Sequence, residues 1–207
     1  MENIADSADR APETDPQARR SVGAKRSPDS QAAILAAAQE ILNEKGYPGF
    51  SIEAVAKRAR AGKPTIYRWW PSKAALLLKV YQKQKRDVVY PDQGPLEDDL
   101  FAFLKSLFWQ WRETPAGAVF RSIIAEAQSN AEAAKALADY SAERRKHSGF
   151  IAQRAIERGE IAATVDPELV ADMVSAYAWI HLLTNRLDED EATMRKAISY
   201  IVNGIKP

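Results

Sequence analysis

The chain has 207 residues, of which 46% are hydrophobic and 28% charged, a composition typical of one or two folded domains with an ample core. It contains no cysteine, which excludes disulfides and thiolate metal sites. No apolar run approaches the roughly 18 residues of a membrane span, and no signal-peptide hydrophobic region follows Met1, so we expect a soluble cytoplasmic protein.

The net charge of +1 conceals two halves of opposite sign. Residues 28–90 hold 11 Lys and Arg against 5 Asp and Glu, whereas residues 91–207 hold 13 against 18. A basic module followed by an acidic one is typical of a nucleic-acid-binding protein with a second, non-binding part. Charge asymmetry of this size also arises by chance, so it needs support from motifs.

Residues 1–27 are polar, carry scattered charge of both signs and lack periodicity, which predicts a disordered tail. A basic cluster lies at the end of this tail: Arg19, Arg20, Lys25 and Arg26. Two interpretations stay open, namely an arm that reaches phosphate or a minor groove, and an ordinary solvated tail.

The first predicted helix begins at Ser27-Pro28, where a capping residue precedes a first-turn proline, and ends at Gly46. Residues 51–73, SIEAVAKRARAGKPTIYRWWPSK, then predict two short helices joined by a tight turn. Ser51 is a good N-cap for the first of them. Gly62 favours the turn because it lacks a Cβ, and Pro64 fits the first turn of the second helix.

The second of these helices brings several hydrogen-bond donors close together. Thr65 suits a base edge or a thymine methyl group, Arg68 and Lys63 suit guanine or phosphate, and Tyr67 and Lys73 suit phosphate oxygens. A short helix of this kind, braced by a preceding one, can enter a major groove. The alternative is a basic surface on an ordinary helical bundle. Helical spacing places Ile66 and Trp70 in the core under either interpretation.

The segment 34–80 resembles the DNA-binding domain of the TetR family of transcriptional regulators, most specifically in ILAAAQEILNEKGYPGFSIEAVAKRA and TIYRWWPSK. The resemblance implies a reading helix whose DNA-facing residues are Lys63, Pro64, Thr65, Tyr67 and Trp69, with phosphate contacts from Ser51 and Lys73. One position departs from the family pattern. Arg60 stands where a glycine with positive φ is usual, so either Arg60 accepts strain or the turn has another geometry.

The rest of the chain predicts helices only, so the fold class is all-α. A fourth helix covers about 72–86, and residues 88–95 (VVYPDQGP) form a linker. Further helices are predicted at 95–113, 115–128, 130–157, 167–185 and 189–204. We expect Asp166 to cap the helix at 167–185 and Asp188 to cap the helix at 189–204. The predicted organisation is a tail (1–27), a helix-turn-helix DNA-binding domain (28–87), and a ligand-binding and dimerisation domain (88–207).

The C-terminal half contains the stretches FRSIIAEAQSN, IERGEI and VDPELVADMV, in which it resembles one subgroup of TetR-type regulatory domains. This resemblance implies that the last two long helices pair with those of a second subunit. Two apolar stripes are compatible with such a homodimer because helices that are apolar over more than one face need a second partner. The first stripe comprises Leu169, Met173, Ala176, Tyr177, Ile180 and Leu183, and the second comprises Ile198, Ile201, Val202 and Ile205.

The resemblance further implies a small-molecule inducer pocket, for which aromatic residues on facing helices are candidates, although such residues more often form plain core. The candidates are Phe103, Phe108, Trp109, Phe120, Phe150, Tyr177 and Trp179, with Gln128, His181 and Asn185 as polar groups. His147 and His181 lack a partner at metal-ligand spacing, so we expect no metal site.

We expect no enzyme and no cofactor, because the chain lacks a Gly-rich phosphate loop, HExxH and G-x-S-x-G. The predicted function is a sequence-specific DNA-binding regulator, a repressor released from a palindromic operator by an inducer. The alternatives are a TetR-like activator and a helical dimeric adaptor without specific DNA binding.

Overall fold

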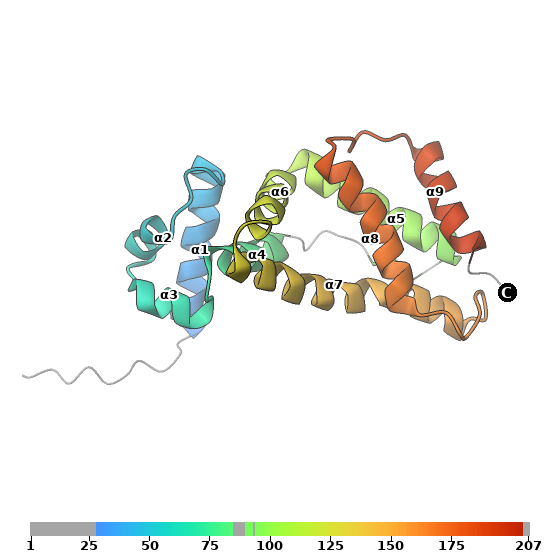
Figure 1. The fold of residues 1–207 in the computed structure, drawn as a ribbon, viewed down its shortest axis with the longest axis horizontal. Coiled ribbons are helices and arrows are strands. Elements are labelled where there is room, and N and C mark those ends of the chain that lie inside the picture. The colour runs from blue at the N-terminus through green and yellow to red at the C-terminus, as the bar shows by residue number, and fades with distance from the viewer. Residues whose placement is uncertain (1–27, 85–89, 93, 205–207) are drawn as a thin grey trace, which may run out of the picture.

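A computed structural model describes residues 28–84, 90–92 and 94–204. The predicted tail, part of the predicted linker and Ile205 lie outside these residues. The described part of the chain consists of nine helices without a strand, which confirms the all-α prediction (Figure 1). None of its helices is both long and apolar enough to cross a membrane.

Helices α1 (Pro28–Lys45), α2 (Ile52–Ala59) and α3 (Lys63–Trp69) form a small bundle at one end of the molecule (Figure 1). The structure confirms the predicted end of α1 and start of α2. Gly46 follows α1 with φ +62°, and the Ser51 hydroxyl oxygen accepts from the Ala54 N–H at 3.1 Å. Pro64 lies in the first turn of α3. The bundle is therefore specified largely by its own caps and turn residues.

Arg60 is the left-handed residue of the turn between α2 and α3, with φ 50° and ψ 39°. Gly62, which the sequence suggested for the turn's unusual backbone, has φ −71°, a value that any residue adopts. Arg60 thus accepts the strain that glycine would avoid. The left-handed conformation lets the Arg60 and Ala61 N–H groups bond to the last carbonyls of α2, at 3.4 and 3.0 Å.

Helix α4 (Lys73–Gln84) joins this bundle to the rest of the molecule. The Ser72 hydroxyl oxygen caps it by accepting from the Ala75 N–H at 3.1 Å. Its buried residues are Ala74, Leu76, Leu77, Leu78, Val80 and Tyr81. They cover most of its circumference, as expected of a helix packed on two sides. α4 contacts α1 on one side and α6 and α7 on the other.

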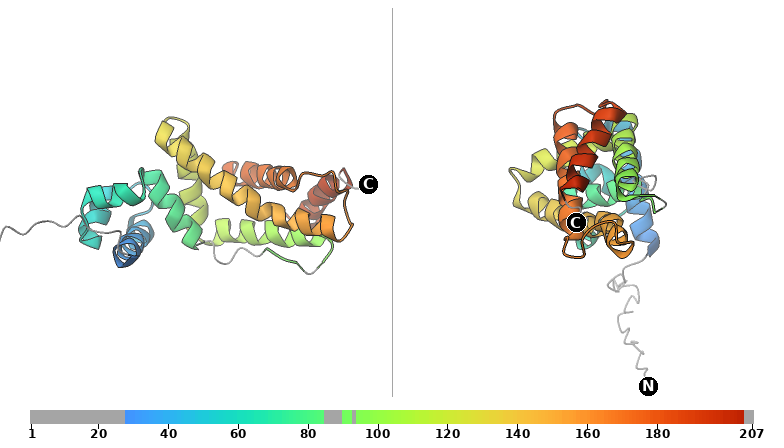
Figure 2. Two further views of the ribbon diagram at one scale, coloured as in Figure 1. Left: turned by 90° about the horizontal axis from the view of Figure 1, so that it is seen from below. Right: turned by 90° about the vertical axis from the view of Figure 1, so that its right-hand side faces the viewer.

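The remaining helices are α5 (Leu96–Glu113), α6 (Ala116–Ala127), α7 (Ala131–Glu157), α8 (Pro167–Leu183) and α9 (Glu191–Asn203). Figure 2 shows α7 running along most of this part, with α8 beside it and α5 and α9 completing the far end. Two glycines permit close approaches between these helices. A Cβ on Gly117 would lie 2.3 Å from the Trp111 carbonyl oxygen, and one on Gly149 would lie 3.3 Å from that of Pro167.

The helix starts confirm one capping prediction and correct another. Asp166 caps α8, where its Oδ1 accepts from the Glu168 N–H at 2.8 Å. The prediction that Asp188 caps α9 is wrong: Asp190 does so, accepting from the Thr193 N–H at 2.9 Å and from the Thr193 hydroxyl at 2.8 Å. Four consecutive acidic residues make the cap ambiguous in sequence, and the extended backbone at Asp190 resolves it.

Candidate functional site

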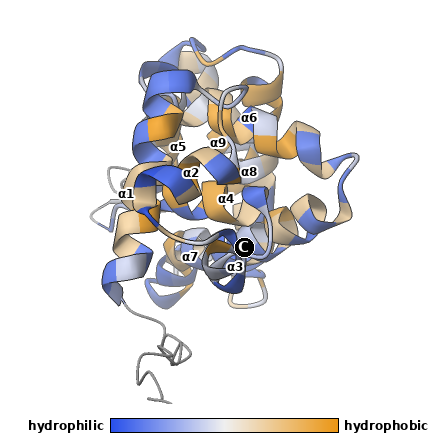
Figure 3. Cartoon of the chain, turned by 90° about the vertical axis from the view of Figure 1, so that its left-hand side faces the viewer, coloured by the Kyte–Doolittle hydropathy of each residue, from blue (hydrophilic) through white to orange (hydrophobic). Residues whose placement is uncertain are grey.

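One face of α3 anchors the helix and the opposite face is open. Ile66 is fully buried and Trp70 nearly so, which confirms both as core residues. Lys63, Pro64, Tyr67 and Arg68 are exposed, and Thr65 and Trp69 are half-buried. The structure therefore gathers the predicted DNA-facing residues around one exposed surface, which we call the reading face. In Figure 3, which looks onto this end of the molecule, hydrophilic colours prevail on α2 and α3.

Ser51 and Lys73 lie at the N-terminal starts of α2 and α4. The Ser51 oxygen is occupied by the cap, but its O–H remains free to donate to a phosphate oxygen. A hydroxyl and an ammonium at helix N-termini suit anionic phosphates, since the helix dipole adds to the attraction.

Lys63 is held by a carboxylate in the DNA-free protein. Its ammonium lies 2.9 Å from Oε1 of Glu53, on the first turn of α2. The hydrogen bond between them raises the pKa of Lys63 and lowers that of Glu53. Both side chains are exposed, so water and salt weaken the pair. A phosphate that takes over Lys63 must displace Glu53.

Lys73 connects the reading face to the rest of the molecule. Its ammonium lies 4.0 Å from the centre of the Tyr47 ring, and burial lowers its pKa. The Tyr47 hydroxyl in turn donates a hydrogen bond to the carboxylate of Glu126, near the end of α6. Lys73, a candidate phosphate contact, is thus connected to α6 through the side chains of Tyr47 and Glu126.

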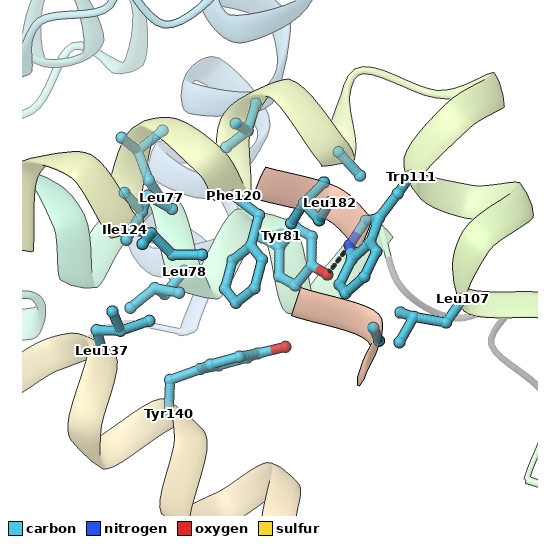
Figure 4. Close-up of a cluster of buried hydrophobic side chains, with 14 of the residues drawn as sticks. Leu77, Leu78, Tyr81, Leu107, Trp111, Phe120, Ile124, Leu137, Tyr140 and Leu182 are labelled. Carbon is cyan, nitrogen blue, oxygen red and sulfur yellow. Dashed lines mark hydrogen bonds between the residues drawn. The ribbon is translucent and has the colours of Figure 1, made fainter. Parts of the chain in front are cut away.

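A partly open cavity of about 280 Å³ lies between α4, α5, α6, α7 and α8. It is lined by Tyr81, Phe103, Leu107, Trp111, Phe120, Tyr140, Ser141, Arg144, Arg145, Ser148, Asp172, Ser175, Ala176 and Trp179. Figure 4 shows Tyr81, Phe120 and Trp111 side by side with Tyr140 beneath them. A cavity with aromatic walls and a few polar groups is the usual form of a small-molecule site.

The predicted ligand residues fall into three groups. Phe103, Phe120 and Trp179 line the cavity. Phe108, Tyr177 and His181 instead pack on one another between α5 and α8, with the Tyr177 and His181 rings 4.2 Å apart. The remaining four, Trp109, Gln128, Phe150 and Asn185, are exposed and do not line the cavity.

His181 has a structural part in this core. Its Nδ1 is 2.8 Å from the Tyr177 carbonyl oxygen and its Nε2 is 2.8 Å from Oε2 of Glu189. The contact with Glu189 links α8 to the segment that leads into α9.

Sequence reasoning missed the cavity residues of α4 and α7. Tyr81 of α4 and Tyr140, Arg144 and Ser148 of α7 line the cavity, and none of them is among the predicted ligand residues. The sequence does contain a signal for three of them. Tyr140, Arg144 and Ser148 recur every four residues along an alanine-rich helix, so their polar side chains lie on one face.

The outer face of α8 is apolar and uncovered in the single chain. Leu169, Ile180 and Leu183 are 52%, 47% and 48% exposed, and they lie on the same side of the helix as Ala176. In the predicted α9 stripe, Ile198 and Val202 are buried within the chain, whereas Ile201 is half-buried. An exposed apolar face of this kind marks an interaction surface.

Two family models match the chain. Residues 34–80 match the family described as bacterial regulatory proteins, tetR family, and residues 90–201 match the tetracyclin repressor-like C-terminal domain. The DNA-binding transcriptional repressor TetR of Mycobacteroides abscessus is 34% identical over 161 residues, covering 75% of this chain and 80% of that protein.

Two further comparisons extend over most of the chain. The uncharacterised HTH-type transcriptional regulator YdeS of Bacillus subtilis is 26% identical over 188 residues, covering 89% of this chain and 93% of that protein. The crystal structure of the TetR family transcription regulator SCO0332 aligns with a TM-score of 0.74 and 30% identity, covering 86% of this chain and 100% of that one.

Proposed function

This chain belongs to the TetR family of helix-turn-helix transcriptional regulators, and from this premise we propose that it is a dimeric repressor that a small molecule releases from a palindromic operator. The reading face carries the proposal. Thr65 and Arg68 read base edges, while Ser51 and Lys73 bind flanking phosphates and fix the register. Lys63 turns from Glu53 to DNA, and Pro64, Tyr67 and Trp69 complete the contact surface.

The exposed apolar face of α8 supports a homodimer in which α8 and α9 pair with their counterparts. Two copies related by a twofold axis present two α3 helices, and such a pair fits half-sites about one helical turn apart. The operator is then an inverted repeat.

The cavity supports regulation by a ligand. Phe120 of α6 lines the cavity, and Glu126 of the same helix binds Tyr47, which holds Lys73. A ligand that changes the position of α6 therefore acts on the reading face through two contacts. The effect equals the difference between its affinities for the free and DNA-bound proteins, and by linkage DNA weakens ligand binding by the same factor.

The test is selection of randomised duplex DNA by the purified full-length protein, followed by transcription from a promoter that carries the selected site. We expect an enriched inverted repeat and reduced transcript. An increased amount of transcript would refute the repressor hypothesis and favour an activator. No enrichment at low salt, from a folded dimer, would refute sequence-specific binding and favour the adaptor.

The dimer face is tested by light scattering on Ile180→Glu, with Trp109→Glu as the control. The two side chains are equally exposed, at 47% and 49%, but Trp109 lies on α5. We expect Ile180→Glu to dissociate the dimer and Trp109→Glu to leave it intact. Dissociation by both variants or by neither would refute the α8 interface.

A further inference from the structure

The aromatic residues that line the cavity pack on one another into a continuous wall. The Tyr81 and Phe120 rings are 4.9 Å apart and 9° from parallel, and the Phe120 and Trp111 rings are 5.9 Å apart and 17° from parallel. The ring planes of Trp179 and Tyr140 make angles of 85° and 62° with the plane of Phe120, so both rings contact this wall in an edge-on arrangement. Aromatic surfaces that meet nearly at right angles favour a flat ligand, which can offer a face to one and an edge to the other.

Hydrogen-bond donors from α4 and α7 converge on the same space. The Tyr140 hydroxyl is buried, and neither it nor Nε of Arg144 has a hydrogen-bond partner among the described residues. The Tyr81 oxygen accepts from Trp111 Nε1 at 2.7 Å, which leaves its own proton to donate. In Figure 4 the hydroxyls of Tyr81 and Tyr140 point the same way. Buried donors without partners are costly, so a ligand that supplies acceptors is favoured.

Both phenols keep their protons at neutral pH. Burial raises the pKa of Tyr81 and of Tyr140 well above the usual value near 10; for Tyr81 it outweighs the hydrogen bond from Trp111, and for Tyr140 the charge of Arg144. Two neutral hydroxyls beside a guanidinium therefore stay donors.

The charges that line the cavity do not cancel. Arg145 is neutralised by Asp172 at 2.9 Å and Glu168 at 3.4 Å. Among the residues that the structure describes, Arg144 pairs only with its sequence neighbour Glu143, at 3.5 Å, and that carboxylate also accepts from Gln82 of α4 at 3.0 Å. The cavity thus keeps one cation with weak compensation, which favours an anionic ligand.

We propose that the cavity binds a small planar aromatic carboxylate, with its ring against the aromatic wall and its carboxylate on Arg144 and Tyr140. This inference rests on the proposed function, since it names the chemical class of the inducer. A cavity of about 280 Å³ is near the lower end of the usual range for small-molecule pockets, which favours a ligand of roughly two fused rings and one acidic group.

The test is calorimetric titration of the full-length protein with three probes of similar size: a naphthoate, the corresponding neutral naphthamide and the anion of a saturated fatty acid. We expect the naphthoate to bind at least about tenfold more tightly than the naphthamide, because a charge-assisted bond is lost in the amide. We also expect it to bind more tightly than the saturated anion.

Variants assign the contacts. Arg144→Met should weaken naphthoate binding about ten- to hundredfold and Tyr140→Phe about two- to tenfold. Lys146→Met removes a positive charge from an exposed position of the same helix outside the cavity, so it should change binding by less than about twofold. Tyr140→Phe deletes a single oxygen and keeps the ring, so it stays informative if Arg144→Met fails to fold.

Three results would overturn the inference: no binding of the naphthoate, equal binding of naphthoate and naphthamide, or full naphthoate affinity in both Arg144→Met and Tyr140→Phe. Operator binding is measured separately in each case. Naphthoate binding that leaves operator affinity unchanged would confirm the site and refute its role as an inducer site. Loss of naphthoate binding with specific operator binding intact would refute the ligand class alone.

Discussion

Replacing Glu53 with Gln should strengthen DNA binding, because Glu53 holds a residue of the reading face. Its carboxylate is 2.9 Å from the Lys63 ammonium in the free protein and lies on the first turn of α2, close to the expected phosphate path. Binding to DNA must break this pair and bring a negative charge toward phosphate. Gln removes the charge, keeps the shape and leaves Lys63 free.

The size of the effect follows from counterion release. One additional phosphate contact steepens the slope of log K against log salt by about 0.9, so raising salt from about 50 to about 200 mM should cost the variant about 3.5-fold more affinity than wild type. At the low-salt end we expect about three- to tenfold tighter binding of nonspecific duplex.

Fluorescence anisotropy with a labelled duplex across this salt range measures both quantities. Glu44→Gln is the matched control: it removes the same charge from an exposed pair, with Arg58 at 2.7 Å, but on α1. We expect a change of less than about twofold from the control. Equal gains in both variants would indicate a general net-charge effect, and unchanged affinity in Glu53→Gln would refute any restraint of Lys63.

Three further predictions concern single residues. Thr65→Ala should relax base preference at one position of the selected site, at a cost of about 1–3 kcal/mol per lost contact, whereas a uniform loss across sequences would contradict base reading. Lys73→Ala should weaken binding to all sequences and flatten the salt slope by about one; an altered base preference with an unchanged slope would contradict its phosphate role. Asp190→Ala should lower the melting temperature by about 2–4 °C and Asp188→Ala by less, as calorimetry would show, since only Asp190 caps α9.

Local signals predicted most of the helices. Ser51 and Asp166 identify helix starts because a short polar side chain beside a first turn satisfies N–H groups that have no other partner. Such effects act over three or four residues and can be read from sequence. Arg60 marks their limit: its left-handed backbone is imposed by the helices on both sides against its own preference.

The cavity could be predicted only in part. Periodicity shows which residues share a face of a helix, but not which faces of different helices meet. Phe120 and Phe108 look equivalent in sequence, yet the first lines the cavity and the second packs on His181. Tyr140 and Arg144 become notable only when Tyr81, about sixty residues earlier, is placed opposite them by the packing of α4 on α7.

The close contact between Gly149 and Pro167 has a geometric consequence for the long helix that contains it. α7 has 27 residues in one unbroken helix, so it is about 40 Å long. The part between Gly149 and its start measures about 27 Å, and a tilt of about 5° around the tight contact with α8 would move that start by about 2.4 Å. Tyr140 lies midway along this arm, and Lys135 and Asp139 face Trp70 across an open groove. Under the proposed regulation α7 would act as a lever, in which a small displacement at the cavity becomes roughly twice as large at the groove beside Trp70.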